Sequence, residues 1–283
     1  MKPATSAPPW QPLTFGGVAA FAHGTLGRLL QVQAAVALVR AGVLLWFFLA
    51  ECLPALQQAM IQLPEQAGVH DGRLVWPGRT PVVLGETAFL GLALNASEGT
   101  TPGTTADLEI LLTPTAVRFT SLLGHLNLPY PSGWTLDLSR QTVTAWWKAW
   151  CRALFVGFLA GTVVLLMASG WVLGLVVAWP VRLAGRLLRR DLTAGGAWRL
   201  AVAAGLPAGL LISAAVVLYG AGQLSLLGVL LAWVAHFLVL AVYAGLAPWW
   251  LPRRIPGARP KANPFSSRTQ AAAGRRPKNP FAG

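Results

Sequence analysis

Few side chains in this sequence have the types and spacing that catalysis requires. The chain contains no H-E-x-x-H or G-x-S-x-G motif, and no paired carboxylates or Ser/His/Asp set near its apolar stretches; hydrolytic and metal-dependent enzymes use such arrangements. His70, Asp71, Glu86 and His125 could meet as metal ligands, but their spacing matches no ligand pattern. The sequence therefore predicts a protein that is not an enzyme, with no catalytic residue, metal site or cofactor.

Two polar side chains interrupt apolar stretches and are candidates for a site inside a membrane, where ionisable groups are costly and often functional. His236 could be a proton relay or a ligand site. The alternative is a neutral imidazole that is hydrogen-bonded to a neighbouring helix. Arg40 lies in a stretch that Glu51 closes, and we expect its long side chain to reach the inner membrane interface.

A long apolar helix must position these groups. Residues 153–181 lie between Arg152 and Arg182 and include no charged residue. At about 1.5 Å per residue they form a helix of roughly 43 Å, and the hydrocarbon core of a bilayer is about 30 Å thick. With 55% hydrophobic and 11% charged residues, the chain is too apolar for a typical soluble protein. Its predicted surroundings are a lipid bilayer.

The fold class that follows is an α-helical integral membrane protein with four transmembrane helices and a small β-rich domain between the first and second. The four predicted spans are residues 32–52, 148–179, 199–219 and 224–247. The last two are separated because residues 200–252 carry no formal charge, which is too long for one span, and 219–223 supply a turn. Residues 1–31 precede the first span, as a short surface helix or a frayed lead-in.

Small residues at four-residue spacing predict where helices pack closely. In the second span, Gly157 precedes Gly161 and Gly170 precedes Gly174 by four positions. In the third span the same spacing continues over four residues. These predicted helix-packing residues are Ala201, Gly205, Gly209 and Ser213.

Residues 53–147 are the one region of the size of a folded domain, and we expect a small antiparallel sheet there. Asp71-Gly72 lies between alternating residues and predicts a tight hairpin turn. A helix over residues 138–150 is expected to close the sheet and lead into the second span.

A second hairpin is predicted within this domain. Residues 106–112 and 116–120 alternate between apolar and polar positions, which is typical of half-buried strands. A turn around Thr113-Pro114 would set their register. The expected cross-strand pairs are Ile110 with Val117, Leu108 with Phe119, and Glu109 with Arg118.

The charges predict which side of the membrane each segment occupies. The chain has 22 basic residues against nine acids, a net charge of +13. Basic residues flank the spans and eight of the nine acids lie between residues 51 and 137. The positive-inside rule therefore places both termini in the cytoplasm and the 53–147 domain outside it. Because this distribution follows topology, we do not expect a nucleic-acid partner.

Two basic segments are expected on the cytoplasmic side. Pro180 is expected to break the second span, so that residues 180–198 form an amphipathic segment on the membrane surface, near anionic lipid headgroups. The residues 251–283 are expected to form a disordered basic tail. The predicted membrane-surface residues are Arg182, Arg186, Arg189 and Arg190, on one helical face.

The only two cysteines are Cys52 and Cys151, and they occur in no C-x-x-C motif. The topology places both at the outer membrane face, where disulfides persist. A disulfide between the first two spans is therefore one hypothesis, and two unpaired thiols in apolar surroundings are the other.

The layout of one anchor, a sheet-rich external domain and three later spans resembles a bacterial membrane family catalogued as a domain of unknown function, whose members are sometimes labelled maltodextrin-utilisation proteins. The last part is also similar to the broader Yip1-like membrane domain. The stretches that carry the resemblance are Leu63-Pro64 and residues 69–75, 90–99, 107–119 and 192–211. It implies a bacterial cytoplasmic membrane and no established catalytic residues.

The function expected from these features is that of a sensor, binding protein or accessory subunit, whose external domain contacts a ligand or an envelope partner. Another membrane protein or a second copy of the chain could pack against its helices. The alternative is a component of a membrane transport system, for which Arg40 and His236 are the available polar groups.

Overall fold

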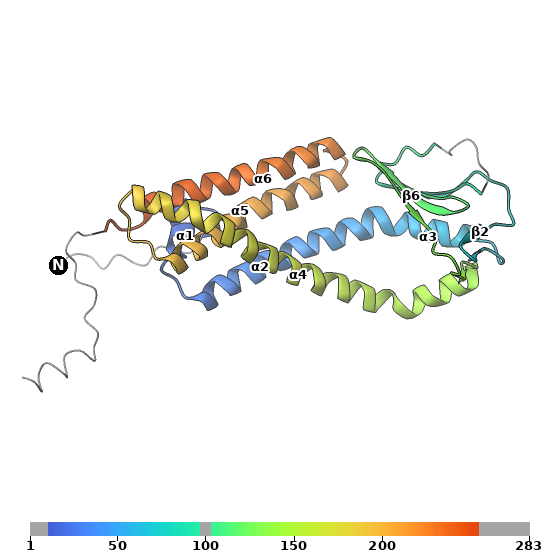
Figure 1. Cartoon of the computed structure of the whole chain (residues 1–283), viewed down its shortest axis with the longest axis horizontal. Helices are drawn as coiled ribbons and strands as arrows, with labels where there is room; N and C mark the ends of the chain where they lie inside the picture. Colours follow the sequence, from blue (N-terminus) through green and yellow to red (C-terminus); the bar gives the residue numbers. More distant parts are fainter. Residues whose placement is uncertain (1–10, 97–102, 255–283) are drawn as a thin grey trace, which may run out of the picture.

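Four helices in this computed structural model are long and apolar enough to cross a membrane, and a β-rich lobe lies between the first and the second of them (Figure 1). The structure describes residues 11–96 and 103–254. Most of the predicted basic tail, 251–283, and part of the 1–31 segment lie outside the described residues. The fold class is confirmed at this level.

The first membrane helix is a continuous rod, Leu26–Gln62. It comprises α2 (Leu26–Phe47), one π-helical turn (Phe48–Cys52) and α3 (Leu53–Gln62), so the helix extends outward beyond the predicted span. The Thr25 hydroxyl accepts a hydrogen bond from the Arg28 amide and caps its beginning.

The segment before this rod folds back into the bundle. The six-residue helix α1 (Phe15–Ala20) begins after the cap residue Thr14. Its Val18 and Ala19 are buried in the same cluster as Leu200. This segment is therefore part of the core at the end of the bundle that lies away from the lobe (Figure 1).

The second membrane helix, α4 (Arg140–Leu187), passes through Pro180 without a break, so the predicted interruption there is wrong. Proline removes one backbone hydrogen bond, to residue 176, and the intact bonds on either side hold an apolar helix together. The helix ends instead at Leu187, with Leu188 as its cap residue, and the following Arg189 adopts a left-handed φ of 52°. The amides of Arg189 and Arg190 then donate to the Arg186 and Gly185 carbonyls, at 3.0 and 2.8 Å, as in a Schellman C-cap.

The third and fourth spans form a tight pair, α5 (Ala194–Gly220) and α6 (Leu226–Leu246), which a short 3-10 turn (Ala247–Trp250) extends. Thr193 and Ser225 cap their beginnings. Pro207 lies inside α5, which also continues past its proline. α5 contacts α2, α4 and α6, so it is the central helix of the bundle.

The lobe contains two sheets. In the small one the order is β2 (Arg73–Val75), β1 (Gly68–His70), β8 (Leu136–Asp137). The larger sheet has the order β3-β4-β5-β6-β7, and its strands are Val82–Glu86, Leu90–Leu94, Leu108–Leu112, Ala116–Ser121 and Gly124–Pro129. β4 and β5 pair in parallel, so the prediction of a wholly antiparallel sheet is wrong. The connection over residues 95–107 is long enough for the crossover that a parallel pair needs.

The two predicted hairpins have different outcomes. The Asp71-Gly72 turn is confirmed: both residues have positive φ, 49° and 73°, and His70 pairs with Arg73. In the β5–β6 hairpin the turn is centred one residue later than expected, on Pro114-Thr115, because the Thr113 amide donates to the Ala116 carbonyl at 2.9 Å.

This shift moves the β5–β6 register by two residues, so each side chain keeps its face but changes its partner. Ile110 pairs with Phe119 instead of Val117. Glu109 pairs with Thr120, and Arg118 donates to the Asn127 side chain on β7, at 3.0 Å. The expected Leu108–Phe119 and Glu109–Arg118 pairs are therefore wrong.

Hydrogen bonds and ring contacts join the lobe to the adjacent end of the bundle. Tyr219, near the end of α5, donates a hydrogen bond from its hydroxyl to the Asp107 carboxylate. The Thr87 hydroxyl donates to the Glu51 carbonyl at 2.7 Å. The Phe89 ring lies 5.0 Å from that of Phe47 and 6.0 Å from that of Tyr219, measured between centroids.

Candidate functional site

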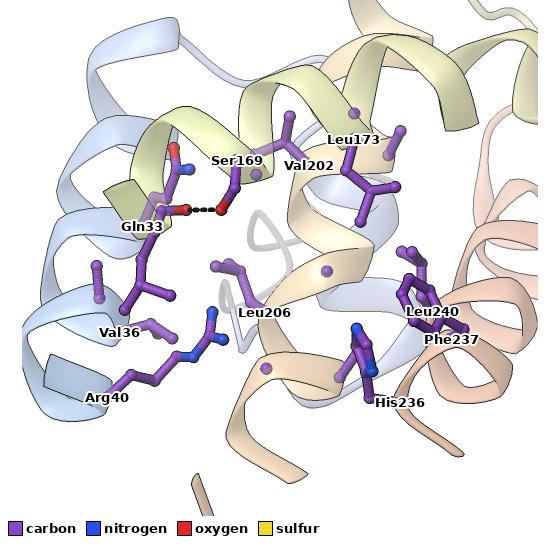
Figure 2. A pocket seen from close by; sticks show the side chains of 18 of the residues that line it. Gln33, Val36, Arg40, Ser169, Leu173, Val202, Leu206, His236, Phe237 and Leu240 are labelled. Carbon is purple, nitrogen blue, oxygen red and sulfur yellow. Dashed lines mark hydrogen bonds between the residues drawn. The ribbon is translucent and has the colours of Figure 1, made fainter. Parts of the chain in front are cut away.

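A cavity of about 350 Å³ lies among α2, α4, α5 and α6, and Figure 2 shows side chains that line it. The position of Gly209 shows how far along α5 the cavity lies. This residue lines the cavity, and it lies 15 residues after Ala194, where α5 begins, and 11 before Gly220, where α5 ends. Most of the wall is apolar side chains and glycine. The polar residues that line it, apart from the Trp233 indole, are Gln33, Arg40, Ser169 and His236.

Arg40 points from α2 into this cavity (Figure 2), and not towards the inner interface as expected. Its guanidinium lies against Gly209, where an added Cβ would be 2.6 Å from Nη1. Glycine is therefore what lets the charged group lie flat on α5. Within residues 11–96 and 103–254, Arg40 has no ion pair and no hydrogen bond.

His236 faces the same cavity from α6. Its Nδ1 contacts the Trp233 carbonyl oxygen on its own helix, and not a neighbouring helix as in the expected alternative. Because a carbonyl can only accept, Nδ1 is the donor in this contact. Arg40 thus supplies hydrogen-bond donors to a cavity that His236 also lines.

Gln33 is a residue that the sequence interpretation missed. It is buried, its Nε2 donates to the Met167 carbonyl at 3.0 Å, and its Oε1 accepts from the Trp171 indole at 2.7 Å. Gly170 makes this possible, since a Cβ there would lie 2.9 Å from Nε2. Its only signal in the sequence was an amide inside an apolar span. Gln33 joins α2 to α4 and has little hydrogen-bonding capacity left for a ligand.

A second cavity adjoins the first on the side towards the C-terminal ends of α4 and α6, away from the lobe. It measures about 320 Å³ and has no polar side chain in its wall. Both cavities share Leu173, Phe237 and Leu240. The residues that line only the second are Val177, Pro180, Val181, Ala241, Ala244 and Gly245. The two cavities together therefore have one charged end and one apolar end.

No match was found among protein-family models, curated proteins or solved structures. The resemblance described from the sequence therefore stays an expectation. What the site can do must be inferred from its geometry.

The predicted helix-packing residues lie on the side of α5 that faces α2 and the cavity. Ala201, Gly209 and Ser213 are buried. Gly205 borders the cavity, and a Cβ added there meets nothing within 4 Å. The stripe therefore makes room for the Arg40 guanidinium and for the cavity, and does not pack tightly along its whole length.

The two glycine pairs of α4 differ. A Cβ on Gly157 or Gly161 meets nothing within 4 Å, whereas one on Gly174 would lie 2.4 Å from Val202 Cγ2 of α5. Only the pair that includes Gly170 and Gly174 is therefore at a close helix contact.

The predicted arginine face is split by the end of α4. Arg182 and Arg186 are exposed on the helix. Arg189 and Arg190 lie beyond Leu187, so the four do not share one helical face as predicted. Arg190 is half-buried and donates from Nη1 to the Leu251 carbonyl at 2.7 Å.

Arg199 has a structural role that the sequence interpretation missed. Its Nε and Nη2 donate to the Phe21 and Ala22 carbonyls at 3.3 and 2.9 Å. The guanidinium therefore satisfies two carbonyls that follow α1 and fastens this segment to the beginning of α5.

Both cysteines are free thiols in the structure, Cys52 buried and Cys151 half-buried, so the hypothetical bridge between them is not formed. Among the described residues, no three His, Cys, Asp or Glu side chains lie together as metal ligands. His70, Asp71, Glu86 and His125 are therefore not brought together as a set.

The lobe has a polar pocket on the face of β5, β6 and β7. Its lining includes Glu109, Arg118, His125 and Asn127. Burial raises the pKa of the Glu109 carboxyl, and the charge of Arg118 opposes this. The pocket is a place where the lobe could contact a polar ligand or partner.

Proposed function

We propose that the protein is a non-enzymatic binding protein of a membrane, a sensor or accessory subunit, which holds a ligand in the mid-bundle cavity. The observation that carries this proposal is Arg40, a cation at mid-depth of the bundle that faces a cavity and has no ion pair among the described residues. A charge in such a position is strongly disfavoured unless another group compensates it. A bound ligand supplies that compensation.

The contacts between lobe and bundle support the sensor role. Tyr219 and Phe47 lie at the outer ends of the helices that line the cavity, and they hold Asp107 and Phe89 of the lobe. A shift of α5 relative to α2 therefore changes the contacts of the lobe. In this proposal the lobe faces the outside of a bacterial cytoplasmic membrane and contacts an envelope partner there.

The cytoplasmic end of the proposed arrangement is basic. Arg182, Arg186 and Arg189 are exposed near the inner end of α4, where anionic lipid headgroups would attract them. The broad exposed face of α4 is available to lipid, to a second copy of the chain or to another membrane protein.

Filling the cavity tests the proposal. A Cβ added at Gly205 or at Gly157 meets no atom within 4 Å, so a larger side chain fits at both positions. Gly205 lines the cavity, so the ring of Gly205→Phe would occupy it. Gly157 does not line the cavity, so Gly157→Phe is the matched control. Small molecules that remain with the purified full chain are extracted and identified by mass spectrometry. We expect a molecule that is retained by the natural protein and by Gly157→Phe but lost from Gly205→Phe. The same content in all three proteins would contradict a binding role for the cavity.

A transport component is the second candidate, because Arg40 and His236 line one cavity near the middle of the bundle. Flux of a solute in liposomes that requires His236 would favour it. Normal flux in His236→Ala, or no flux with any solute, would leave the binding role as the better proposal.

A further inference from the structure

We infer that the ligand of this cavity is a single-chain amphipathic anion, an acyl chain that ends in a carboxylate, with its head on Arg40 and its chain in the adjoining apolar cavity. This inference rests on the proposed function and adds the chemical class of the ligand. Three observations support it: the charge in the first cavity, the apolar wall of the second cavity, and the depth of each cavity in the bundle.

The charge of the first cavity selects an anion. None of the residues that line either cavity is an acid. Arg40 is therefore the one fixed charge of the pair of cavities, and its planar fork of donors matches a carboxylate in two parallel hydrogen bonds. Of the other polar side chains, Gln33 is bonded to Met167 and Trp171, and Ser169 donates to the Leu166 carbonyl at 3.1 Å. The side chains of Gln33 and Ser169 therefore already have hydrogen-bond partners in the protein, which leaves Arg40 as the main group that binds the carboxylate.

The second cavity selects a chain. Its wall is formed by side chains such as Val177 and Leu240 and has no polar side chain. Pro180, Ala241 and Gly245 in its wall are exposed, so this cavity is open towards the surface of the bundle, and it offers a bound molecule only apolar contacts. Since Leu173, Phe237 and Leu240 belong to both walls, a chain that starts at Arg40 passes between α4 and α6 into this space.

The depths favour a free single-chain amphiphile over a bilayer phospholipid. Gly209, beneath the guanidinium, lies near the middle of α5, while Val181 and Gly245 lie near the inner ends of α4 and α6. The head of the ligand is thus deeper in the membrane than its tail. A phospholipid in its own leaflet has the opposite orientation, since its phosphate lies at the surface.

The test measures binding of radiolabelled oleate to the full chain in nanodiscs of phosphatidylcholine. Wild type should bind oleate saturably. Oleyl alcohol, which is the neutral analogue of oleate, should compete only weakly with it, and so should phosphatidylglycerol. Arg40→Gln should lower the affinity about ten- to a hundredfold, because it removes charge-assisted hydrogen bonds. Arg40→Lys should lower it less, and Arg152→Gln, at an exposed arginine of α4, should not change it.

The apolar end has its own variant, which keeps the test decisive if Arg40→Gln fails to fold. Ala241→Phe fills the second cavity and should also weaken oleate binding, whereas Val234→Phe, on an exposed position of the same helix, should not.

Three results would overturn the inference: equal affinities of Arg40→Gln and Arg152→Gln, equal competition by oleyl alcohol, or binding of phosphatidylglycerol in preference to oleate. If oleate does not bind but Gly205→Phe still loses a retained molecule, the ligand class is wrong and the binding function stands. If neither is seen, both are wrong.

Discussion

The helices α5 and α4 are both apolar enough to cross a bilayer, yet protein encloses one and leaves the other open. In the most apolar part of α5, 56% of the residues are buried inside the structure, compared with 6% in α4. Apolar character alone therefore identifies a membrane span but does not say what surrounds it. Lipid and protein are equally acceptable neighbours for such a surface.

The difference between the two helices follows from side-chain size. The buried positions of α5 include Ala197, Ala204 and Ala208, which let α2, α4 and α6 approach closely. α4 instead exposes large side chains such as Leu165 and Trp179. The cavity exists where the small residues of α5 meet Arg40, so the enclosed helix, and not the longest one, organises the candidate site.

The largest expected effect comes from removing a large side chain of α5. Leu200 is fully buried and Leu165 of α4 is 68% exposed. We expect Leu200→Ala to lower the free energy of unfolding by about 2–5 kcal/mol because it leaves a cavity. Leu165→Ala should change it by less than about 0.5 kcal/mol. Unfolding of the two variants in mixed micelles measures both. Equal losses would show that α4 is enclosed as well.

Removing the Arg199 guanidinium should have the next largest effect. Arg199→Met keeps the apolar stem but loses the hydrogen bonds to Phe21 and Ala22. Hydrogen bonds to charged groups contribute about 1.5–3 kcal/mol. We expect faster amide exchange over residues 15–24 and little change in α4. Unchanged exchange there would mean that α5 does not hold α1 in place.

Two glycines of α4 allow an enclosed and an open position to be compared within one helix. Gly174→Ala brings a methyl group within 2.4 Å of Val202 and should destabilise the bundle by about 1–3 kcal/mol. Gly157→Ala meets no atom within 4 Å and should be neutral or stabilise by up to about 1 kcal/mol, because alanine favours a helix. The thermal unfolding temperatures of the two variants, measured in one detergent, test this prediction. A larger loss of stability in Gly157→Ala than in Gly174→Ala would mean that α5 does not pack against α4 at Gly174.

The smallest expected effect concerns the N-terminal end of α4, which is capped by local hydrogen bonds. Hydrogen bonds from Thr142 and Ser139 lower the pKa of the Asp137 carboxyl. Its folded pKa is below the unfolded one, so this contribution is present above the unfolded pKa of about 4 and is lost as the pH falls through the folded value. The protection of the amides of residues 140–143, relative to their intrinsic exchange rate at each pH, should therefore fall in acid in wild type. Asp137→Asn should remove this dependence without changing α5.

The sequence predicted the features that depend on local composition. Four apolar stretches identified the candidate spans, Asp71-Gly72 identified its turn, and Arg40 and His236 were recognised as two of the polar residues that line the cavity. The direction of Arg40 was not predictable in this way, because the space that receives it is made by Gly209 on another helix.

Features that depend on distant parts of the chain were missed. The parallel pair joins β4 and β5, which 13 residues separate in the sequence (95–107), and its direction is not a property of either strand. Gln33 and Arg199 look like isolated polar residues until their partners, Met167 and Ala22, are known. At Pro180 the missing hydrogen bond was given too much weight relative to those on either side.

The most direct measurement is labelling of the full chain in liposomes with a lipid-soluble carbene precursor, followed by mass spectrometry of its peptides. Exposed positions of α4, such as Leu165, Val172 and Val176, should be heavily labelled, α5 around Leu200 and Ala204 sparsely labelled, and the lobe strands β3 to β6 not labelled. Equal labelling of α4 and α5, or labelling of these lobe strands at the level of α4, would contradict a four-helix membrane bundle that is organised around α5.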